Sequence, residues 1–346
     1  VYDVQQVEVL RGPQGSLFGR NTTAGIIKFD TVRPSQALAA RGTLSYGSHN
    51  SVSLDGGIGG SLVADKLAFR ISTLIQHRDD YVDNVYAGRS ADGTITPKKN
   101  AMGGFDDGNV RLQLLWTPTD RLSILTSAHG RWYDGTSTLF LRQALKKGSN
   151  DVSGVARTRV SYDEAHDNRQ AYDSYGASIR TTYDFGPVAL TSISAWETTS
   201  GYSRGDTDGG AAADFGGTGF GQSQGQVRGL DQFTQELRLA STGDGPFKWQ
   251  LGGMYFDSRD TTDFYQRAYF LTGAARNPNN WVRLHDVNTS WAVFGQASYK
   301  IGNLTLTGGA RYTEDRKHTT LLQAALNAAG TTANFPANAP RDVRLV

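Results

Sequence analysis

The sequence contains no cysteine, which excludes a disulfide framework and any thiolate metal site. It also lacks an excess of either charge, because 35 Lys and Arg stand against 33 Asp and Glu and leave a net charge of +2. A chain so close to neutrality is a poor partner for nucleic acid, and we expect none. The six histidines are scattered without the spacing of a metal site, so we expect neither a metal nor another cofactor.

Long hydrophobic runs are missing too. No stretch of about 18 apolar residues is present, which excludes a membrane-spanning helix but leaves membrane-spanning strands open. Motifs of the Walker type and of the GxSxG type are also absent, and we expect no enzyme and no catalytic residues. The first residues show neither the charged nor the apolar region of a signal peptide. We therefore take the chain to be a fragment of a longer protein.

Glycine and aromatic residues are what the sequence has in quantity. Its 41 glycines follow no collagen period, and 10% aromatic residues is too much for a disordered chain. The length allows one large domain or two ordinary ones. The composition therefore indicates a folded protein with many turns.

One segment near the start carries a motif. Residues 7–34 read VEVLRGPQGSLFGRNTTAGIIKFDTVRP. Two β-runs flank a turn at Arg11-Gly12-Pro13, where glycine permits a positive φ and proline fixes the next φ near −65°. The glycines that follow suit a backbone that crosses a confined space. Taken alone, these residues also allow an ordinary β-turn-β unit of a soluble domain.

The same segment resembles the last part of the plug domain of TonB-dependent outer-membrane receptors. The motif positions that match are Gly12, Pro13, Gly15, Gly19, Asn21 and Gly25. The sequence departs from the family at Ile26, Lys28 and Asp30, where a small residue, Asn and Val are common. The resemblance implies capture of a ligand outside a Gram-negative cell and energised uptake through a plugged barrel in its outer membrane.

After Pro34 the chain becomes a series of alternating apolar and polar residues, in runs of about 9–12 residues, the length that a tilted strand needs to cross a bilayer. In one run, Leu304, Leu306 and Tyr312 alternate with Thr305 and Arg311. One face of each strand thus suits lipid and the other a wet interior. Eleven runs can be placed, at 41–48, 50–60, 66–79, 107–117, 120–133, 173–184, 187–200, 229–241, 246–259, 287–300 and 302–316.

The connections between these runs alternate in length. Short turns are separated by long polar segments at about 80–106, 134–172, 201–228 and 258–287, as in outer-membrane barrels with short periplasmic turns and long outer loops. Aromatic residues gather at both ends of the strands, as in two interfacial girdles. Those near the short turns are Trp116, Tyr183, Trp249 and Tyr299, and those at the other ends are Trp132, Tyr133, Trp196, Tyr255, Trp291 and Tyr312.

These patterns predict an all-β fold. We expect an antiparallel transmembrane β-barrel with about 11 strands, where the resembled family has 22, preceded by the C-terminal part of a plug domain. The predicted boundaries are 1–38 for the plug part and 39–346 for the N-terminal half of the barrel. An odd number of strands leaves two open edges, so we expect the isolated fragment to aggregate.

The resemblance also implies a lock between plug arginines and barrel glutamates. By motif position the plug side is assigned to Arg11 and, second, to Arg20, and the barrel side to Glu236, which faces inward beside Arg238. The alternative from the residues alone is that Glu236 pairs with an arginine of the barrel wall. Aromatic residues of the 258–287 loop are candidates to stack on a ligand or to pack the loops together. They are Phe264, Tyr265, Tyr269, Phe270 and Trp281.

The function implied by the resemblance is TonB-dependent uptake of a scarce small molecule, with a ferric siderophore the commonest substrate of the family. An oligosaccharide, haem or cobalamin stays open as the substrate. The expected partners are the TonB complex of the inner membrane, outer-membrane lipid and lipopolysaccharide, and the substrate. Two other classes share part of the pattern: a passive porin, which does not need residues 7–34, and a secreted β-sandwich binding module, which does not need aromatic girdles. By the resemblance, we expect the TonB-contacting segment to precede Val1.

Overall fold

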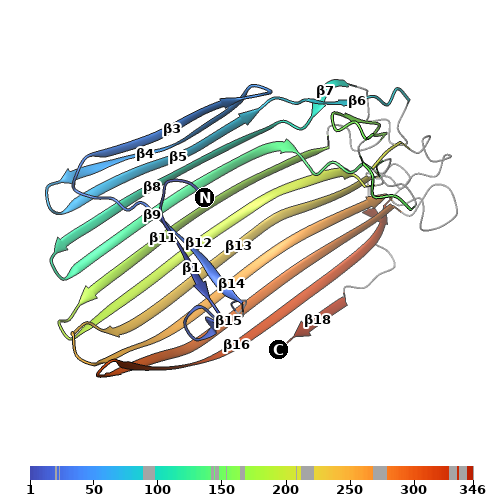
Figure 1. Ribbon diagram of the computed structural model, residues 1–346. Helices are drawn as coiled ribbons and strands as arrows, with labels where there is room; N and C mark the ends of the chain where they lie inside the picture. Colours follow the sequence, from blue (N-terminus) through green and yellow to red (C-terminus); the bar gives the residue numbers. More distant parts are fainter. Residues whose placement is uncertain are drawn as a thin grey trace.

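The computed structural model consists almost entirely of β-strands (Figure 1). It describes residues 1–19, 22, 24–88, 98–141, 144, 148–152, 154–163, 168–207, 209–211, 222–267, 279–326, 333–334 and 341–345. Within these residues no helix has the length and apolarity needed to cross a membrane.

One large antiparallel sheet forms the body of the molecule, and its long strands follow one another in chain order. They are β3 (Ala39–Gly47), β4 (Ser51–Val63), β5 (Leu67–Arg78), β8 (Phe105–Thr119), β9 (Leu122–Thr136), β11 (Arg169–Asp184), β12 (Val188–Asp206), β13 (Gln222–Ser241), β14 (Phe247–Arg267), β15 (Asn279–Ile301) and β16 (Leu304–Leu326). Two short strands, β17 (Ala333–Asn334) and β18 (Arg341–Leu345), pair with β16. The predicted all-β barrel sheet with eleven long strands is confirmed.

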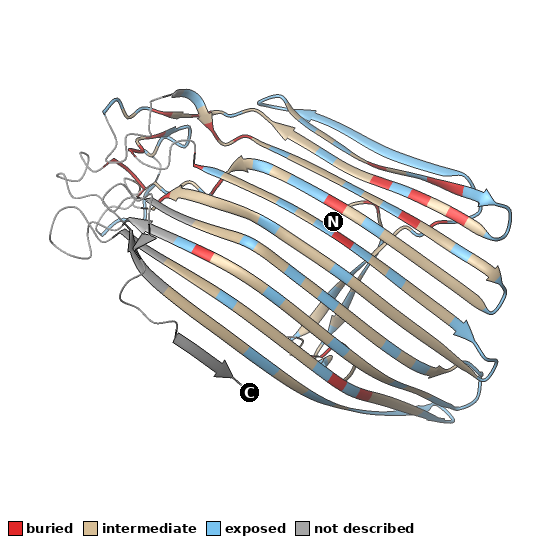
Figure 2. Cartoon of the chain, turned by 180° about the vertical axis from the view of Figure 1, so that it is seen from behind, coloured by how far each residue is buried: buried red, intermediate tan, exposed pale blue. Residues whose placement is uncertain are grey.

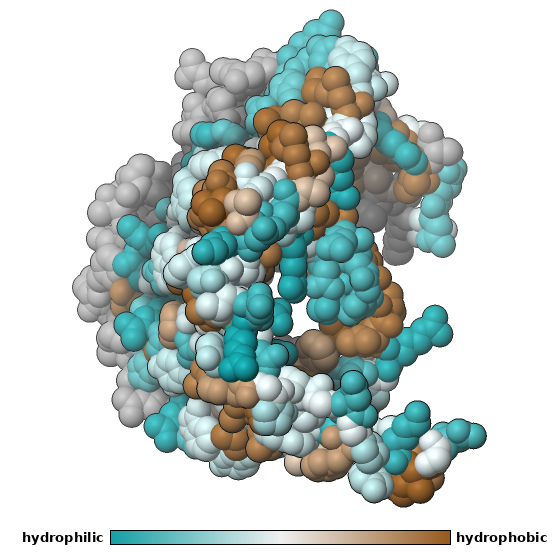
Figure 3. Space-filling view, turned by 90° about the vertical axis from the view of Figure 1, so that its left-hand side faces the viewer, coloured by the Kyte–Doolittle hydropathy of each residue, from teal (hydrophilic) through white to brown (hydrophobic). Residues whose placement is uncertain are grey.

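The sheet curves into an open shell. Figure 3 looks along the strands and shows the shell around a hollow. The short turns after β4, β8, β11, β13 and β15 lie at one end of the strands, and the short turn between β3 and β4 lies at the other end, near β6 and β7 (Figure 1). This arrangement matches the alternation of short and long connections in the sequence.

The last strands are longer than predicted. β12 continues to Asp206, and β13 begins at Gln222 rather than at 229. The pairing of β12 with β13 has a register shift between Thr199 and Gly201, and that of β13 with β14 has one between Val227 and Gly229. These bulges coincide with the predicted strand ends. An extra residue in a bulge interrupts the alternation of side chains on which the prediction was based, although the hydrogen-bonded strand continues beyond it.

The outer face of the sheet carries the apolar and aromatic side chains. Trp291 and Tyr312 lie with ring centroids 5.5 Å apart, and the Trp132 indole donates a hydrogen bond of 2.9 Å to the Tyr175 hydroxyl. Large apolar side chains such as Leu237 and Leu306 are exposed there, as expected for a surface that contacts lipid. Tyr133 differs from the prediction: it pairs with Asp107, one residue out of phase with Trp132, and so faces the interior.

The long connections near the first strands are packed together rather than isolated. Short strands β6 (Val82–Asn84), β7 (Lys98–Met102) and β10 (Arg159–Val160) form a separate three-stranded sheet. Val82, Met102, Val160 and Tyr162 make a small buried core under it. The sequence pattern, which read these segments as polar loops, does not reveal this core.

Residues 1–38, here called the N-terminal segment, lie on the concave side of the sheet (Figure 1). They form a hairpin of β1 (Val4–Arg11) and β2 (Gly25–Thr31), with one turn of helix, α1 (Gly15–Phe18), at its tip. The hairpin is a sheet of its own. Whether a domain boundary falls at residue 38 stays a prediction.

Candidate functional site where the N-terminal segment meets the sheet

The start of the N-terminal segment is attached to the sheet through Asp3. Its side chain is completely buried, and its carboxylate accepts hydrogen bonds from Arg70 Nε at 2.5 Å and Nη2 at 2.7 Å. Arg41 Nε lies 2.8 Å from the same carboxylate, and the Ser72 hydroxyl donates to it at 2.5 Å. One acid thus meets two arginines and a hydroxyl, which satisfies both of its oxygens.

The residues beside Asp3 extend this attachment to neighbouring strands. Arg41 Nη2 donates to the Val4 carbonyl at 2.9 Å, and Arg111 Nη2 donates to the Tyr2 carbonyl at 3.1 Å. The Arg111 guanidinium also lies 4.6 Å from the centre of the Tyr2 ring, a cation–π contact. Tyr2, Asp3 and Val4 are therefore held by β3, β5 and β8. We call these contacts the Asp3 latch.

A glycine on β4 makes room for the latch. A Cβ atom on Gly57 would lie 2.9 Å from Arg70 Nη2 and 2.9 Å from Asp3 Oδ2, closer than side chains approach. Gly57 pairs in register with Ser72, and Gly59 pairs with Arg70. The buried positions of β4 and β5 in Figure 2 include this region. The glycines of β4 thus serve the close approach of Asp3 to the wall.

The electrostatics of the latch favour a charged Asp3. Burial by itself raises the pKa of the carboxyl group, but the hydrogen bonds from Arg70 and Ser72, with the charges of Arg70 and Arg41, lower its pKa to about 2. The ordinary value is 3.8. The ion pair is therefore fully formed at neutral pH.

The tip of the hairpin reaches the opposite part of the sheet. Gly19, at a φ of +79°, lies against the Arg311 guanidinium of β16, which would be 3.3 Å from a Cβ atom there. Arg311 also donates to the Thr313 hydroxyl at 2.9 Å and lies 5.2 Å from the centre of the Phe294 ring. The N-terminal segment thus crosses the concave face from β3 to β16.

The plug-motif residues form the turn between the two strands of the hairpin. The Gly12 amide donates to the Ala24 carbonyl at 3.2 Å, and Gly12 has a φ of +82° beside Pro13. Gly25 has a φ of +144°, and a Cβ atom there would lie 2.5 Å from the Leu10 carbonyl oxygen, so only glycine closes the hairpin. Gly15 starts α1. Asn21 lies outside the described residues.

The predicted lock residues are not brought together in the described part of the chain. Arg11 ends β1, is exposed and makes no ion pair among the described residues. Arg20 lies outside the described residues. Glu236 forms an ion pair with Arg238 on its own strand. A lock between these plug residues and Glu236 stays a prediction.

A second group of charges surrounds Arg180 on β11. The charge of Arg180 on β11 interacts with those of Arg33 and Asp30, and with those of Glu236 and Arg238 on β13. Arg180 thus interacts with charges of both the N-terminal segment and β13. Sequence reasoning missed Asp3, Arg70 and Arg33 because their partners are distant in the chain. Arg70 lies among apolar residues of β5, and this charge in an apolar strand is the signal that could have indicated a buried ion pair.

The candidate ligand-contacting aromatics lie at the outer end of β14 and β15. Phe264 is 47% exposed. Tyr265 and Trp281 pair in register across the two strands, and their side chains are outside the described residues, as are Tyr269 and Phe270. Their role in ligand contact stays a prediction.

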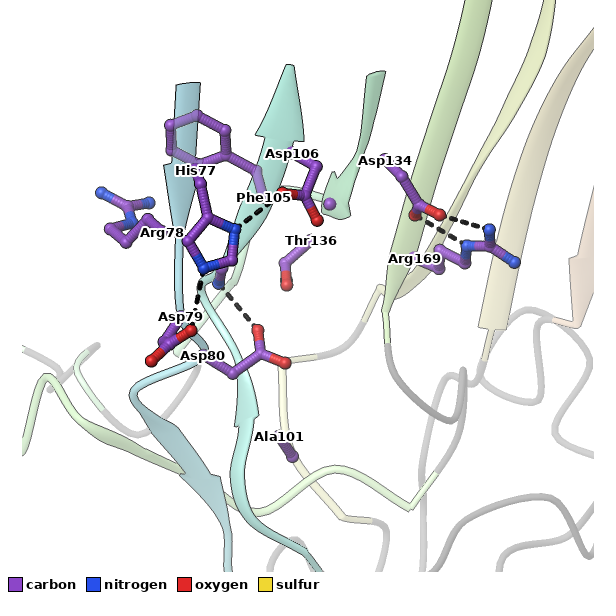
Figure 4. A pocket seen from close by; sticks show the side chains of 12 residues that line it. His77, Arg78, Asp79, Asp80, Ala101, Phe105, Asp106, Asp134, Thr136 and Arg169 are labelled. Carbon is purple, nitrogen blue, oxygen red and sulfur yellow. Dashed lines mark hydrogen bonds and ion pairs between the residues drawn. The ribbon is translucent and has the colours of Figure 1, made fainter. Parts of the chain in front are cut away.

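A polar cavity of about 280 Å³ opens at the outer ends of β5, β8 and β9 (Figure 4). The His77 ring lies between two carboxylates, with Nδ1 2.6 Å from Asp106 and Nε2 2.9 Å from Asp79. Because carboxylates only accept hydrogen bonds, both contacts are satisfied when the ring is protonated. The hydrogen bond from Asn50 and then that from His77 lower the pKa of Asp79.

His77 and Asp106 of this cavity have the phase of the lipid-side face of the sheet, whereas Arg78 and Phe105 have the opposite phase. His77 alternates in phase with the exposed Ile71 and Ile75, and its partner Asp106 lies two residues beyond Gly108, which pairs with Trp132. Along the strands, His77 and Asp106 lie beyond Trp132, on the outer side of the predicted aromatic girdle. Among the described residues, no group of three or more His, Asp and Glu is arranged to hold a metal ion.

No protein-family model matches the sequence. The pesticin receptor of Yersinia enterocolitica serotype O:8 is 28% identical over 255 residues, which are 73% of this chain and 33% of that protein. The pesticin receptor of Yersinia pestis is 28% identical over 258 residues, with the same shares covered. The chain thus spans about a third of the length of these relatives.

Solved structures share the fold. The ferric yersiniabactin uptake receptor FyuA from Yersinia pestis aligns with a TM-score of 0.73 at 19% identity, over 99% of this chain and 48% of that one. The ferric-catecholate import receptor Fiu from E. coli K12 aligns with a TM-score of 0.66 at 14% identity, over 99% and 50%. The copper transporter OprC aligns with a TM-score of 0.56 at 16% identity, over 99% and 47%.

Fold and sequence similarity together define the class of protein. The resemblance to TonB-dependent receptors of the siderophore-receptor type is confirmed, and so is the location in the outer membrane of a Gram-negative bacterium. The relatives are receptors rather than enzymes.

Proposed function

We propose that this chain belongs to a TonB-dependent transporter that takes up a scarce substrate, a ferric siderophore, across the outer membrane. In this proposal the N-terminal segment is part of a plug that closes the barrel, and the TonB complex displaces it to open a path. The chain acts as a transporter and not as an enzyme. Outer-membrane lipid and lipopolysaccharide surround its outer face.

The Asp3 latch carries the proposal. A passive porin has no use for a segment held to its inner wall by a buried acid and two arginines. Removing one partner of such a pair leaves an uncompensated buried charge, which costs about 3–5 kcal/mol. Displacing the segment from this attached, seated state must break its contacts with β3, β5 and β8 together, which takes work. Energised displacement is the step that supplies such work.

The substrate class is supported by the relatives and by the outer loops. The similar structures include a ferric yersiniabactin receptor and a ferric-catecholate receptor. The packed core of β6, β7 and β10 gives the outer end a defined surface for ligand capture. Phe264 and its aromatic neighbours are the residues that we assign to ligand contact.

Uptake of radioactive iron tests this function. The full-length receptor, produced in a strain that lacks its own siderophore receptors, should take up iron from a ferric siderophore only when TonB is present. Haem, cobalamin and an oligosaccharide serve as parallel substrates. If the receptor takes up one of these molecules and no iron, that molecule replaces the ferric siderophore as the proposed substrate. TonB-independent diffusion of all of them would contradict the transporter and favour a porin.

A further inference from the structure

A groove of about 660 Å³ lies on the lipid-facing side of β14, β15 and β16. We call it the lipid-side groove. Its floor consists of backbone and of four small residues that lie side by side on β15 and β16: Gly295, Ala297, Gly308 and Ala310. These residues have the same phase as the exposed Val293 and Leu306, so they face away from the N-terminal segment. Large apolar side chains cover much of this face of the sheet, and here the face is hollow.

Large apolar and aromatic side chains border the groove. They are Phe247, Trp249 and Leu251 along β14, the pair of Val293 and Tyr312 toward the outer ends of the strands, and the pair of Tyr299 and Leu306 toward the short turns. Val293 and Tyr299 stand six positions apart on β15. At ~3.4 Å per residue and a tilt of ~40° they span roughly 15 Å of depth. The hydrocarbon core of a bilayer is ~30 Å thick, so the groove has the depth of one leaflet.

Gly308 has no explanation in the packing of the described chain. A Cβ atom there would have nothing within 4 Å, and its φ is not in the left-handed region. Gly295 differs, because a Cβ atom on it would lie 2.7 Å from Leu251 Cδ2. Glycine weakens the interior of a strand, and it often marks a place where a ligand approaches the backbone closely. The open space over Gly308 therefore suits an occupant from outside the chain.

The position of the groove identifies the leaflet that it meets. The short turns of an outer-membrane barrel lie on the periplasmic side, so the groove is at the level of the inner leaflet. That leaflet consists of phospholipid, whereas lipopolysaccharide is in the outer leaflet. The groove is also continuous with the surface that contacts lipid, since Leu304 and Leu306 are exposed beside it.

A positive charge stands at the periplasmic end of the groove. Lys300 directly follows Tyr299 and is exposed. A lysine side chain keeps its apolar stem along the protein surface and holds its ammonium group at the membrane interface, where the phosphates of lipids lie. An apolar groove next to a cation is complementary to an acyl chain attached to an anionic phosphate.

We propose that the lipid-side groove binds one acyl chain of an inner-leaflet phospholipid, with its phosphate beside Lys300. Apolar surfaces gain no hydrophobic free energy by meeting each other inside a membrane, so binding there depends on close packing, which small residues permit. The bare floor at Gly308 and the side chains along the rim supply that packing. The site needs only the location in the outer membrane, and neither TonB nor a transported substrate takes part in it.

Native mass spectrometry of the full-length receptor tests the proposal. The receptor, stripped of lipid in detergent micelles, is titrated with dipalmitoyl phosphatidylglycerol, and we expect one tightly bound molecule per receptor. Gly308→Leu places a side chain in the groove and should weaken this binding by about tenfold or more. Ala177→Leu is the matched control. Ala177 is exposed and has the phase of the exposed Ile179 on β11, so the added leucine faces lipid away from the groove and should leave binding unchanged.

Two further variants separate the groove from the headgroup contact. Ala310→Leu fills the groove from the other end of its floor, and it replaces Gly308→Leu if that variant does not fold. Lys300→Gln should weaken binding of phosphatidylglycerol by about fivefold, the contribution of one lysine next to an anionic lipid. Dipalmitoyl glycerol, which has no phosphate, should bind with the same affinity to Lys300→Gln and to the unchanged receptor.

Other results would overturn the site. Equal binding of phosphatidylglycerol by Gly308→Leu, by Ala310→Leu and by the unchanged receptor would show that the groove holds no lipid, as would an equal loss in Ala177→Leu. A receptor dimer that Gly308→Leu abolishes would assign the groove to a second copy of the chain. Retention of lipopolysaccharide in place of phosphatidylglycerol would contradict the assigned leaflet. Iron uptake enters none of these results, so the proposed function stands or fails separately.

Discussion

Asp3 and Arg70 form a two-point ion pair across 67 residues of sequence, with Arg70 Nε 2.5 Å from Asp3 Oδ2 and Arg70 Nη2 2.7 Å from Asp3 Oδ1. Both side chains are buried against the inner wall of the sheet. The planar guanidinium matches the carboxylate at two points, which a lysine ammonium does not. The pair therefore fixes the orientation of the N-terminal segment as well as its attachment.

Replacing Arg70 should release the start of the segment. We expect Arg70→Met to destabilise the seated state by about 3–5 kcal/mol, because it leaves a buried, less compensated Asp3. Arg70→Lys should recover part of this loss. Protease cleavage between Val1 and Arg11 in the folded receptor measures the released fraction. Equal cleavage of Arg70→Met and the unchanged receptor would show that the pair is not needed for seating.

Acid should weaken the same contact within a defined range. The pKa of Asp3 is about 2 in the seated state and near its ordinary value of 3.8 when released. A lowered pKa means that the stabilisation is complete above about pH 4 and is lost as the pH falls toward 2. The difference between the two pKa values of Asp3 corresponds to on the order of 2 kcal/mol of stabilisation of the seated state. A fluorophore on Val1→Cys reports release as the pH is lowered, and Asp3→Asn should show no change over this range. A transition of the same size in Asp3→Asn would assign the effect to other groups.

The glycine beneath the latch gives a steric test. Gly57→Ala should destabilise the seated state by about 1–3 kcal/mol, because its methyl group would overlap Arg70 and Asp3. Gly42→Ala on β3 is the matched control, since the nearest atom to its added carbon is a carbonyl oxygen at 3.9 Å. Cleavage of the N-terminal segment by protease compares the two. A larger effect at Gly42 would mean that strand pairing, and not the latch, limits stability.

A substitution of Glu236 tests the predicted lock by comparing transport with binding. In the predicted lock it acts on plug displacement, so Glu236→Ala in the full-length receptor should reduce iron uptake more than binding of the ferric siderophore to the cell surface. Glu236 pairs with Arg238, and its charge acts on Arg180, which also interacts with Asp30 and Arg33 of the N-terminal segment. Parallel uptake and binding curves measure the difference. Equal losses in both would remove Glu236 from the lock.

The small core of the outer loops predicts a local change in stability. Met102 is completely buried with Val82, Val160 and Tyr162. Met102→Ala should cost about 2–5 kcal/mol locally and loosen β6, β7 and β10, while the long strands stay intact. Hydrogen exchange of the amides in these strands, compared with those of β9, measures the effect. Unchanged protection of β6 and β7 would show that the core does not hold the loops.

The positions of the strands could be predicted from local sequence. In a membrane strand every second side chain faces lipid and is apolar, so apolar and polar residues alternate along the strand. The runs around Leu114, Leu237 and Leu306 were placed in this way, and the structure has strands at all of them. The ends of β13 to β16 were not found, since alternation fades where water meets both faces and bulges interrupt it. The core around Tyr162 was missed because its members come from two loops, each polar on average.

The sequence by itself determined the fold class, the number of long strands and the hairpin turn at Gly12 and Pro13, because each depends on neighbours within a dozen residues. Only the tertiary structure decided that Asp3 meets Arg41 and Arg70, and that Gly19 rests on Arg311. These pairs depend on the curvature of the sheet, which brings strands far apart in the chain around one short segment. Curvature is a property of the whole sheet, and no local pattern of residues encodes which charges will face one another across it.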